Sequence, residues 1–221
     1  MKYIVLKFND VKLDVRDIAK VRGYFATNFS DNPLLHNHLP NGKFSYKFPK
    51  IQYRLFNGNP ALIAMEEGIE VLKEVFFLSD EMVIGNKVFN LNEKEILSYD
   101  VEIGQHSDFF YYEFLSPYMA LNQENYIKYQ EADKYDKISL LKDILKSNLK
   151  TISKGFSYEI PEFDKITVEA NLRTKLINFK NVKMLCFTGD FKTNFLIPDY
   201  WGLGKQSARG FGVVKRSTNR R

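Results

Sequence analysis

The spacing of apolar residues in the first half of the chain predicts strands and helices in one particular order. Four segments have the length and composition of strands or carry a hairpin signal, namely "KYIVLKF" (2–8), "KIQYRLF" (50–56), "ALIAM" (61–65) and a stretch with a turn at Gly85-Asn86 that ends near Gly104. Two segments between them have apolar residues at helical spacing, namely Ile18, Val21, Phe25 and Phe29, and then Ile69, Leu72 and Phe76. The order β-α-β-β-α-β is the ferredoxin-like, RRM-like plan.

The second half repeats this plan with one element changed. An aromatic strand, "FFYYEFLSP" (109–117), precedes a long helix whose apolar face comprises Ile138, Leu141, Leu145, Leu149 and Ile152. A strand at 165–179 turns at Lys180-Asn181 into "NVKMLCFTGDF" (181–191), and its apolar face comprises Val168, Ala170, Leu172, Thr174 and Leu176. "KTNFLIPDYW" (192–201) lacks a helical period and contains Pro198, so the second helix is expected to be reduced or missing before a last strand, "FGVVK" (211–215).

We therefore predict an α+β protein of two tandem ferredoxin-like (RRM-like, βαββαβ) domains. The first domain is expected to span residues 1–104 and the second residues 105–221. The second domain should have a degenerate second helix and a glycine-rich loop near its C-terminal end. A length of 221 residues with 44% apolar residues suffices for two such cores.

Charge is distributed unevenly along the chain. Residues 32–65 contain four basic and no acidic residues, residues 66–102 ten acidic and three basic, and residues 200–221 six basic and no acidic ones. Such segregation suggests a basic face for a polyanion. Ordinary solvated surface charge remains an alternative.

Membrane, disulfide and thiolate-metal chemistry are not expected. No apolar run reaches the roughly 18 residues of a membrane span, and the N-terminal sequence is charged too early for a signal peptide, so a cytoplasmic location is expected. The single cysteine, Cys186, has no partner for an internal disulfide and is interpreted as a buried core thiol.

The segment "GLGKQSARGFG" (202–212) is the most distinctive stretch of the sequence. Its four glycines allow positive φ angles and close approach to a ligand. A Walker loop would need Ser or Thr at Gln206, and the dinucleotide fingerprint would need glycine at Ser207. Lys205 and Arg209 among glycine amides favour a sugar-phosphate backbone as the ligand, with an ordinary turn as the alternative.

This C-terminal segment, after tandem ferredoxin-like halves and with histidines in the first half, resembles the RAMP superfamily. More narrowly, the chain is similar to the CRISPR-associated endoribonucleases that cut repeat RNA into guide RNAs. The resemblance implies that CRISPR repeat RNA, in precursor crRNA, is the substrate. It also implies an interference complex or a second copy of the chain as further partners, and no membrane partner.

His36 and His38 in "HNH" are the candidate catalytic pair. If this segment is extended, residues i and i+2 point to the same side, so two imidazoles converge. With pKa values near 6.5, one imidazole can take the proton of a ribose 2′-OH while the other protonates the leaving 5′ oxygen. Lys43 or Tyr46 could stabilise the charge on the phosphorane. Neither a metal nor another cofactor is expected.

Other interpretations of the histidine pair remain open. The two residues could be surface residues without function, metal ligands, or part of the metal nuclease motif that is also called HNH. For the whole protein, the rivals are a non-catalytic RAMP subunit that caps a guide RNA and a ferredoxin-like pair that binds protein. The third histidine, His106, is expected to be structural.

The remaining candidates are positions for RNA contact. Basic residues of the acid-free segments and of one strand face should contact phosphates. The candidates are Lys47, Lys50, Arg54, Arg173, Lys175, Lys205 and Arg209, together with Gly202, Gly204, Ser207 and Gly210 of the glycine-rich segment.

Overall fold

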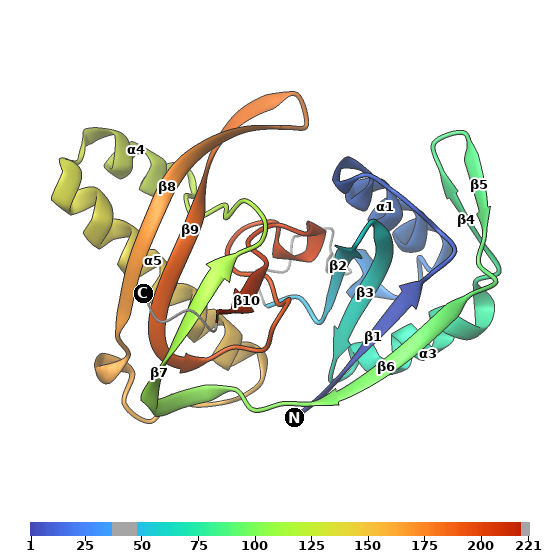
Figure 1. Ribbon diagram of the computed structural model, residues 1–221, viewed down its shortest axis with the longest axis horizontal. Helices are drawn as coiled ribbons and strands as arrows, with labels where there is room; N and C mark the ends of the chain where they lie inside the picture. The colour runs from blue at the N-terminus through green and yellow to red at the C-terminus, as the bar shows by residue number, and fades with distance from the viewer. Residues whose placement is uncertain (37–47, 218–221) are drawn as a thin grey trace. The chain divides into compact units, whose positions relative to one another are not determined.

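The computed structural model describes residues 1–36 and 48–217, which divide into two compact units. The first unit comprises residues 1–101 together with Ala208–Gly210, and the second comprises residues 102–207 and 211–221. Each unit contains one antiparallel four-stranded sheet and helices (Figure 1). This confirms an α+β protein with two antiparallel sheet domains.

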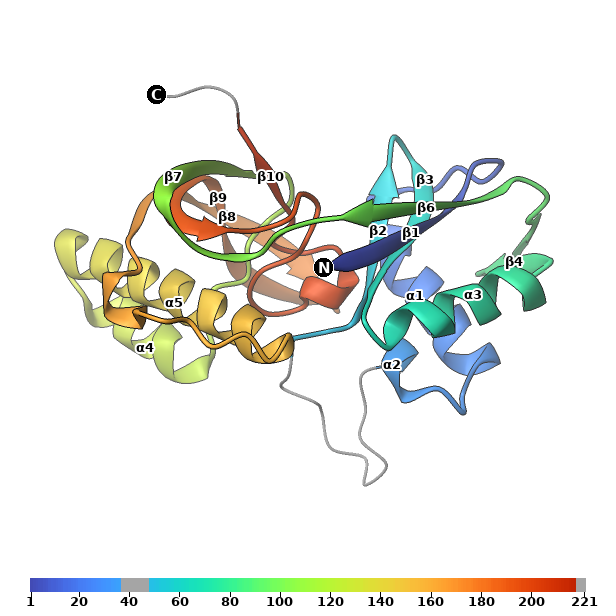
Figure 2. The ribbon, with the colours of Figure 1, turned by 90° about the horizontal axis from the view of Figure 1, so that it is seen from below.

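The first unit has the strand and helix order that the sequence predicts. Its elements are β1 (Lys2–Phe8), η1 (Val15–Asp17), α1 (Ile18–Asn28), α2 (Pro33–His36), β2 (Ile51–Phe56), β3 (Asn59–Met65), α3 (Gly68–Leu78), β4 (Glu81–Ile84), β5 (Lys87–Asn90) and β6 (Lys94–Asp100). The sheet order is β2-β3-β1-β6, with every neighbouring pair antiparallel. The helices α1 and α3 cover one face of this sheet (Figure 2).

Aromatic packing forms the core of the first unit. Phe8 of β1 stacks on Phe25 of α1 with ring centroids 5.7 Å apart, and both side chains are fully buried. Leu62 of β3 and Leu72 of α3 belong to the same buried cluster. Burial of each such side chain stabilises the fold by about 1.5–3 kcal/mol, which fixes α1 and α3 on the sheet.

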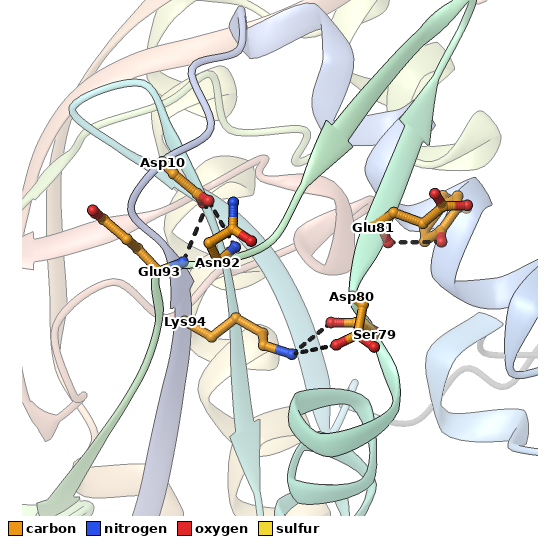
Figure 3. A network of polar contacts seen from close by, with 8 residues as sticks. Asp10, Ser79, Asp80, Glu81, Asn92, Glu93 and Lys94 are labelled. Carbon is orange, nitrogen blue, oxygen red and sulfur yellow. Dashed lines mark hydrogen bonds and ion pairs between the residues drawn. The ribbon is translucent and has the colours of Figure 1, made fainter.

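The β4–β5 hairpin is an insertion between α3 and β6 that polar contacts hold at its base (Figure 3). The Lys94 ammonium donates to the Ser79 carbonyl oxygen at 2.6 Å and lies 3.4 Å from the Asp80 carboxylate. Asp10 Oδ2 accepts from the backbone amide of Asn92 at 2.8 Å. The hairpin turns at Gly85, as the sequence predicts, with a φ of 64°.

The second unit has the same sheet order but a shorter connection before its last strand. Its elements are β7 (Gly104–Phe114), α4 (Gln123–Glu131), α5 (Lys134–Gly155), η2 (Phe163–Lys165), β8 (Val168–Phe179), β9 (Val182–Leu196), η3 (Ser207–Arg209) and β10 (Val214–Arg216). The order β10-β7-β9-β8 places the first and last strands side by side, as in the first unit. Among the described residues, the connection from β9 to β10 contains the 3-10 turn η3 in place of a helix. This is consistent with the ferredoxin-like plan and its degenerate second helix.

One expectation about β8 is wrong. The alternating pattern predicts a buried face through Leu176, yet the Leu176 side chain is 69% exposed. The strand pairing gives the reason, because β7 pairs with β9 only as far as Asp190. Phe187 of β9 still forms a bridge with Tyr118, and beyond it β8 and β9 continue as a two-stranded ribbon to the turn at Lys180-Asn181, where both residues have positive φ. Alternation therefore predicts the strand correctly but not its burial.

Candidate nucleic-acid interface

The start of the histidine segment belongs to a short helix. His36 is the last residue of α2, so the assumption that this segment is extended is wrong at its first histidine. The other predicted members of the segment, His38, Lys43, Tyr46 and Lys47, lie outside the described residues.

The end of α2 is attached to the sheet of the first unit. The Tyr53 hydroxyl on β2 donates to the Leu35 carbonyl oxygen at 3.2 Å. The Leu35 side chain is 1% exposed and belongs to the core, so both backbone and side chain hold this residue. At the other end of α2, the Leu34 amide donates to the Asn32 side chain at 3.3 Å. The backbone that leads into His36 is therefore fixed against β2.

Two arginines of the first unit, Arg22 and Arg209, lie near Tyr53. Burial lowers the pKa of Arg22 on α1, and the charge of Arg209 lowers it further. Burial also lowers the pKa of Arg209. The tip of the glycine-rich segment packs here, since a Cβ atom placed on Gly210 would lie 2.8 Å from Ile18 Cδ1 and 3.6 Å from the Tyr53 carbonyl oxygen. Arg22, one turn after Ile18, is therefore near both Tyr53 and Arg209.

Sequence reasoning missed Arg22. It lies on a helix whose neighbouring basic residue, Lys20, makes an ordinary i,i+3 ion pair with Asp17 at 2.7 Å. The spacing of residues in α1 gives no reason to prefer Arg22 over Lys20 as a functional residue. The signal that identifies Arg22 is tertiary, because it consists of the approach of Ala208–Gly210 from a distant part of the chain.

Glycine is required at several turns of the glycine-rich segment. A Cβ atom on Gly212 would lie 2.1 Å from the Leu203 carbonyl oxygen, and one on Gly204 would lie 2.6 Å from the Tyr118 ring. Both glycines have positive φ angles, of 60° and 74°. The Lys205 amide donates to the Met119 carbonyl oxygen at 3.0 Å, which fixes the loop on the second unit.

The predicted contact residues of this segment differ in accessibility. Lys205 is exposed and Arg209 is half-buried. Gly202, Ser207 and Gly210 are buried, with the Ser207 residue 6% exposed. The buried three shape the loop, and the two basic side chains are the ones that can reach a ligand.

Two predicted phosphate contacts are not exposed, because Arg54 on β2 is buried and Lys50 just before β2 is half-buried. The Arg54 residue is 3% exposed, and its guanidinium donates to the Tyr53 carbonyl oxygen at 2.7 Å and to the Gln52 side chain. Burial lowers the pKa of Arg54 to about 9. The Lys50 side chain is 12% exposed and forms an ion pair with Glu66. The absence of acids from residues 32–65 was misleading, because Glu66 begins the next segment.

Arg173 and Lys175 are exposed on β8 and point to the same side of the strand. They pair with Thr188 and Cys186 of β9, beyond the last residue of β9 that pairs with β7. Their placement agrees with the expected basic strand face.

Two further titratable residues, Cys186 and His106, lie within the described residues. Across residues 1–36 and 48–217, no group of three His, Cys, Asp or Glu side chains is arranged to hold a metal ion. Cys186 is fully buried, and burial raises the pKa of its thiol to about 11, as a core thiol requires. His106 packs edge-on against Phe110, with centroids 5.3 Å apart.

No helix within the described ranges has the length and apolar character of a membrane span.

Known proteins resemble this chain over both halves. A sequence model of the Cas6b N-terminal domain matches residues 1–102, and one of the Cas6b C-terminal domain matches residues 104–217. A crystal structure of Cas6b superposes with a TM-score of 0.90 at 34% identity, covering 98% of this chain and 99% of that chain. A structure of the CRISPR RNA processing endoribonuclease Cas6b superposes with a TM-score of 0.78 at 30% identity, covering 98% and 100%. An uncharacterized protein of Methanocaldococcus jannaschii is 37% identical over 122 residues, which are 52% of this chain and 78% of that protein.

Proposed function

Because this chain belongs to the Cas6b family, we propose that it is an endoribonuclease that cleaves CRISPR repeat RNA in precursor transcripts. The observation that carries the proposal is the likeness to a CRISPR RNA processing endoribonuclease over nearly the whole of both chains. The same proposal assigns tandem ferredoxin-like domains with a boundary at residues 104–105. The common sheet order of the two units supports that assignment.

The proposed reaction uses the ribose 2′-OH as the nucleophile. The neutral imidazole of one residue of the pair His36 and His38 takes the 2′-OH proton, and the 2′ oxygen forms a bond to phosphorus. The bond from phosphorus to the 5′ oxygen breaks, and the imidazolium of the other histidine protonates that oxygen. The products are a 2′,3′-cyclic phosphate, or a 3′-phosphate after its hydrolysis, and a 5′-hydroxyl.

The substrate therefore supplies the attacking group, and no metal-activated water is needed. Charge that builds on the phosphorane still requires a cation or a donor. Lys43 and Tyr46, ten or fewer residues along the chain from His36, are the proposed sources.

Arg22 and Arg209 are proposed to hold the phosphates that flank the scissile bond. Burial and then the nearby charge of Arg209 lower the pKa of Arg22, and a bound phosphate would favour the charged form of both side chains. An arginine side chain binds phosphate oxygens with a fork of donors, which suits this role. The hydrogen bond from Tyr53 to Leu35 supports the proposal, because it fixes the backbone that leads into His36 beside the same residues.

RNA affinity is proposed to come from Lys205 and Arg209 of the glycine-rich segment and from Arg173 and Lys175 of β8. All four are basic, and three of them are exposed while Arg209 is half-buried. An interference complex or a second copy of the chain is retained as a proposed further partner.

The decisive experiment uses a CRISPR repeat RNA from the source genome as the substrate. Cleavage is expected to persist in EDTA and to stop when the nucleotide immediately 5′ of the scissile phosphate is replaced by its 2′-deoxy form. Cutting of the deoxy substrate, or inhibition by EDTA that magnesium reverses, would contradict the chemistry. Tight binding of the repeat without any cutting would favour a subunit that caps guide RNA.

A further inference from the structure

A regular row of lysines runs along α5 of the second unit. Lys142, Lys146, Lys150 and Lys154 recur at every fourth position. Residues four apart are neighbours on a helix surface, and each step advances about 6 Å along the axis at 1.5 Å per residue. The apolar side of α5 packs on its own unit through Leu141, Ile144, Leu145, Leu149 and Ile152. The row is not among the buried residues of α5 (Figure 2 shows the helix), and Lys150 and Lys154 are exposed while the other two lysines are half-buried.

The row is not neutralised by acidic side chains. None of its four ammonium groups lies within 4.0 Å of a carboxylate oxygen of a described residue, whereas Lys128 on the preceding helix pairs with Glu124 at 2.6 Å. The helix α5 contains six lysines and two aspartates, Asp136 and Asp143, so its net charge is +4. Like charges at i,i+4 destabilise a helix, and this row contains three such pairs in succession.

The middle of the row is held by one aromatic ring. The Lys146 and Lys150 ammonium groups lie 5.0 Å and 4.6 Å from the centroid of Phe163. Lys146 also donates to the Asp164 carbonyl oxygen at 3.2 Å. These contacts restrict the two side chains without removing their charge, so little further ordering is needed to bind an anion there.

We propose that this lysine row is a second RNA-binding surface, which contacts successive phosphates of one strand without reading the bases. The inference rests on the proposed function only in its choice of RNA as the polyanion. The linear arrangement at equal steps fits a strand with a phosphate at every nucleotide. Lysine contacts phosphate as a point charge, so the surface carries no sequence information.

The test measures the salt dependence of RNA binding. The probe is the repeat RNA with some flanking sequence, made uncleavable by the single 2′-deoxy substitution, and affinity is read by fluorescence anisotropy at several salt concentrations. Replacing Lys146 and Lys150 by Gln should flatten the log-log salt slope by about 1.4, because each lost phosphate contact on a single strand contributes about 0.7. The same substitutions to Arg should restore both slope and affinity.

Two further variants keep the test decisive. Lys142→Gln with Lys154→Gln changes no residue that contacts Phe163 or Asp164 and should flatten the slope similarly, by up to about 1.4. Lys73→Gln with Lys87→Gln removes the same charge from exposed sites of the first unit and should leave the slope unchanged. Thermal melting should show that all variants are folded.

If both α5 double variants keep the slope and affinity of the parent protein, the inference is overturned. This is also the result expected if the lysine row binds an acidic protein in place of RNA. A slope that falls equally in the Lys73 and Lys87 control would overturn it too, because the effect would then be net charge alone. Single-turnover cleavage at saturating RNA should be unaffected by all of these changes. One further outcome is that the parent protein does not cut the repeat without the 2′-deoxy substitution while the α5 variants still flatten the salt slope of RNA binding. The proposed function then fails and the second RNA-binding surface stands.

Discussion

The hydroxyl of Tyr53 donates to the carbonyl oxygen of Leu35 at 3.2 Å, and this bond joins β2 to the residue immediately before His36. Both partners are buried, so the bond is shielded from water. It connects the sheet of the first unit to the entrance of the segment that carries the proposed chemistry. The backbone at His36 should therefore depend on this bond together with the buried Leu35 side chain.

Tyr53→Phe should lower the free energy of unfolding by about 1–3 kcal/mol, because the Leu35 carbonyl loses a buried donor. It should also slow single-turnover cleavage, with a smaller effect on RNA affinity. The control is Tyr112→Phe, since the Tyr112 hydroxyl donates to the Ile197 carbonyl oxygen at 3.2 Å and accepts from the Ile197 amide at 2.8 Å in the second unit. The control should lose at least as much stability and retain its cleavage rate. Equal cleavage rates in the two variants would contradict a positioning role for Tyr53.

Replacing either His36 or His38 with Ala should slow cleavage by about a hundredfold or more, the usual scale of general acid–base catalysis, while RNA affinity changes little. The double variant should lose much less than the product of the single effects, because the two residues act as one unit. Single-turnover rates and anisotropy separate chemistry from binding. Normal cutting by both single variants would show that the pair has no catalytic part. An effect of only one would leave Tyr46 or Lys43 for the other role.

Lys205→Ala with Arg209→Ala should weaken RNA binding and flatten its salt slope by about 1.4, at about 0.7 for each phosphate contact. The fold should survive, because Lys205 is exposed and Arg209 is half-buried. Arg209→Ala should also slow cleavage and Lys205→Ala should not, since only Arg209 belongs to the first unit. Unchanged binding in the double variant would mean that the glycine-rich segment is only a structural turn.

Gly212→Ala should destabilise the protein more than Gly85→Ala. Both glycines have left-handed φ angles, of 60° and 64°, which cost an alanine roughly 1–2 kcal/mol. A Cβ atom on Gly85 meets nothing within 4 Å, whereas one on Gly212 lies 2.1 Å from the Leu203 carbonyl oxygen. The difference between the two melting temperatures measures the tightness of the loop. Equal losses would show that the segment can relax around a side chain.

Local signals were enough to predict most elements of both sheets. β1 has the predicted bounds, and Lys180 and Asn181 form the predicted turn with φ angles of 50° and 63°. The helix α4 was not predicted, and the reason is physical. It has no buried residues, so it carries no apolar stripe that a sequence could reveal.

The site was harder to predict than the fold because it depends on which distant residues meet. The sequence identified the glycine-rich segment and the exposed Lys205 within it. It could not distinguish the buried Arg54 from an exposed arginine, since the pattern of β2 is apolar on both sides of that position. Arg22 could not be predicted as a site residue, because only the folded chain brings Arg209 close to it.

The first unit is discontinuous in sequence, because Ala208–Gly210 belongs to it although the rest of its residues end at position 101. Domains usually fold in order as the chain leaves the ribosome. Here the last piece of the first unit, Ala208–Gly210, is synthesised only after residues 102–207 of the second unit. The surroundings of Arg22 and Tyr53 are therefore completed only after β7, β8 and β9 have been made. A product that stops before Ala208 would carry His36 and His38 but lack Arg209, so one member of the proposed arginine pair is supplied only after most of the second unit.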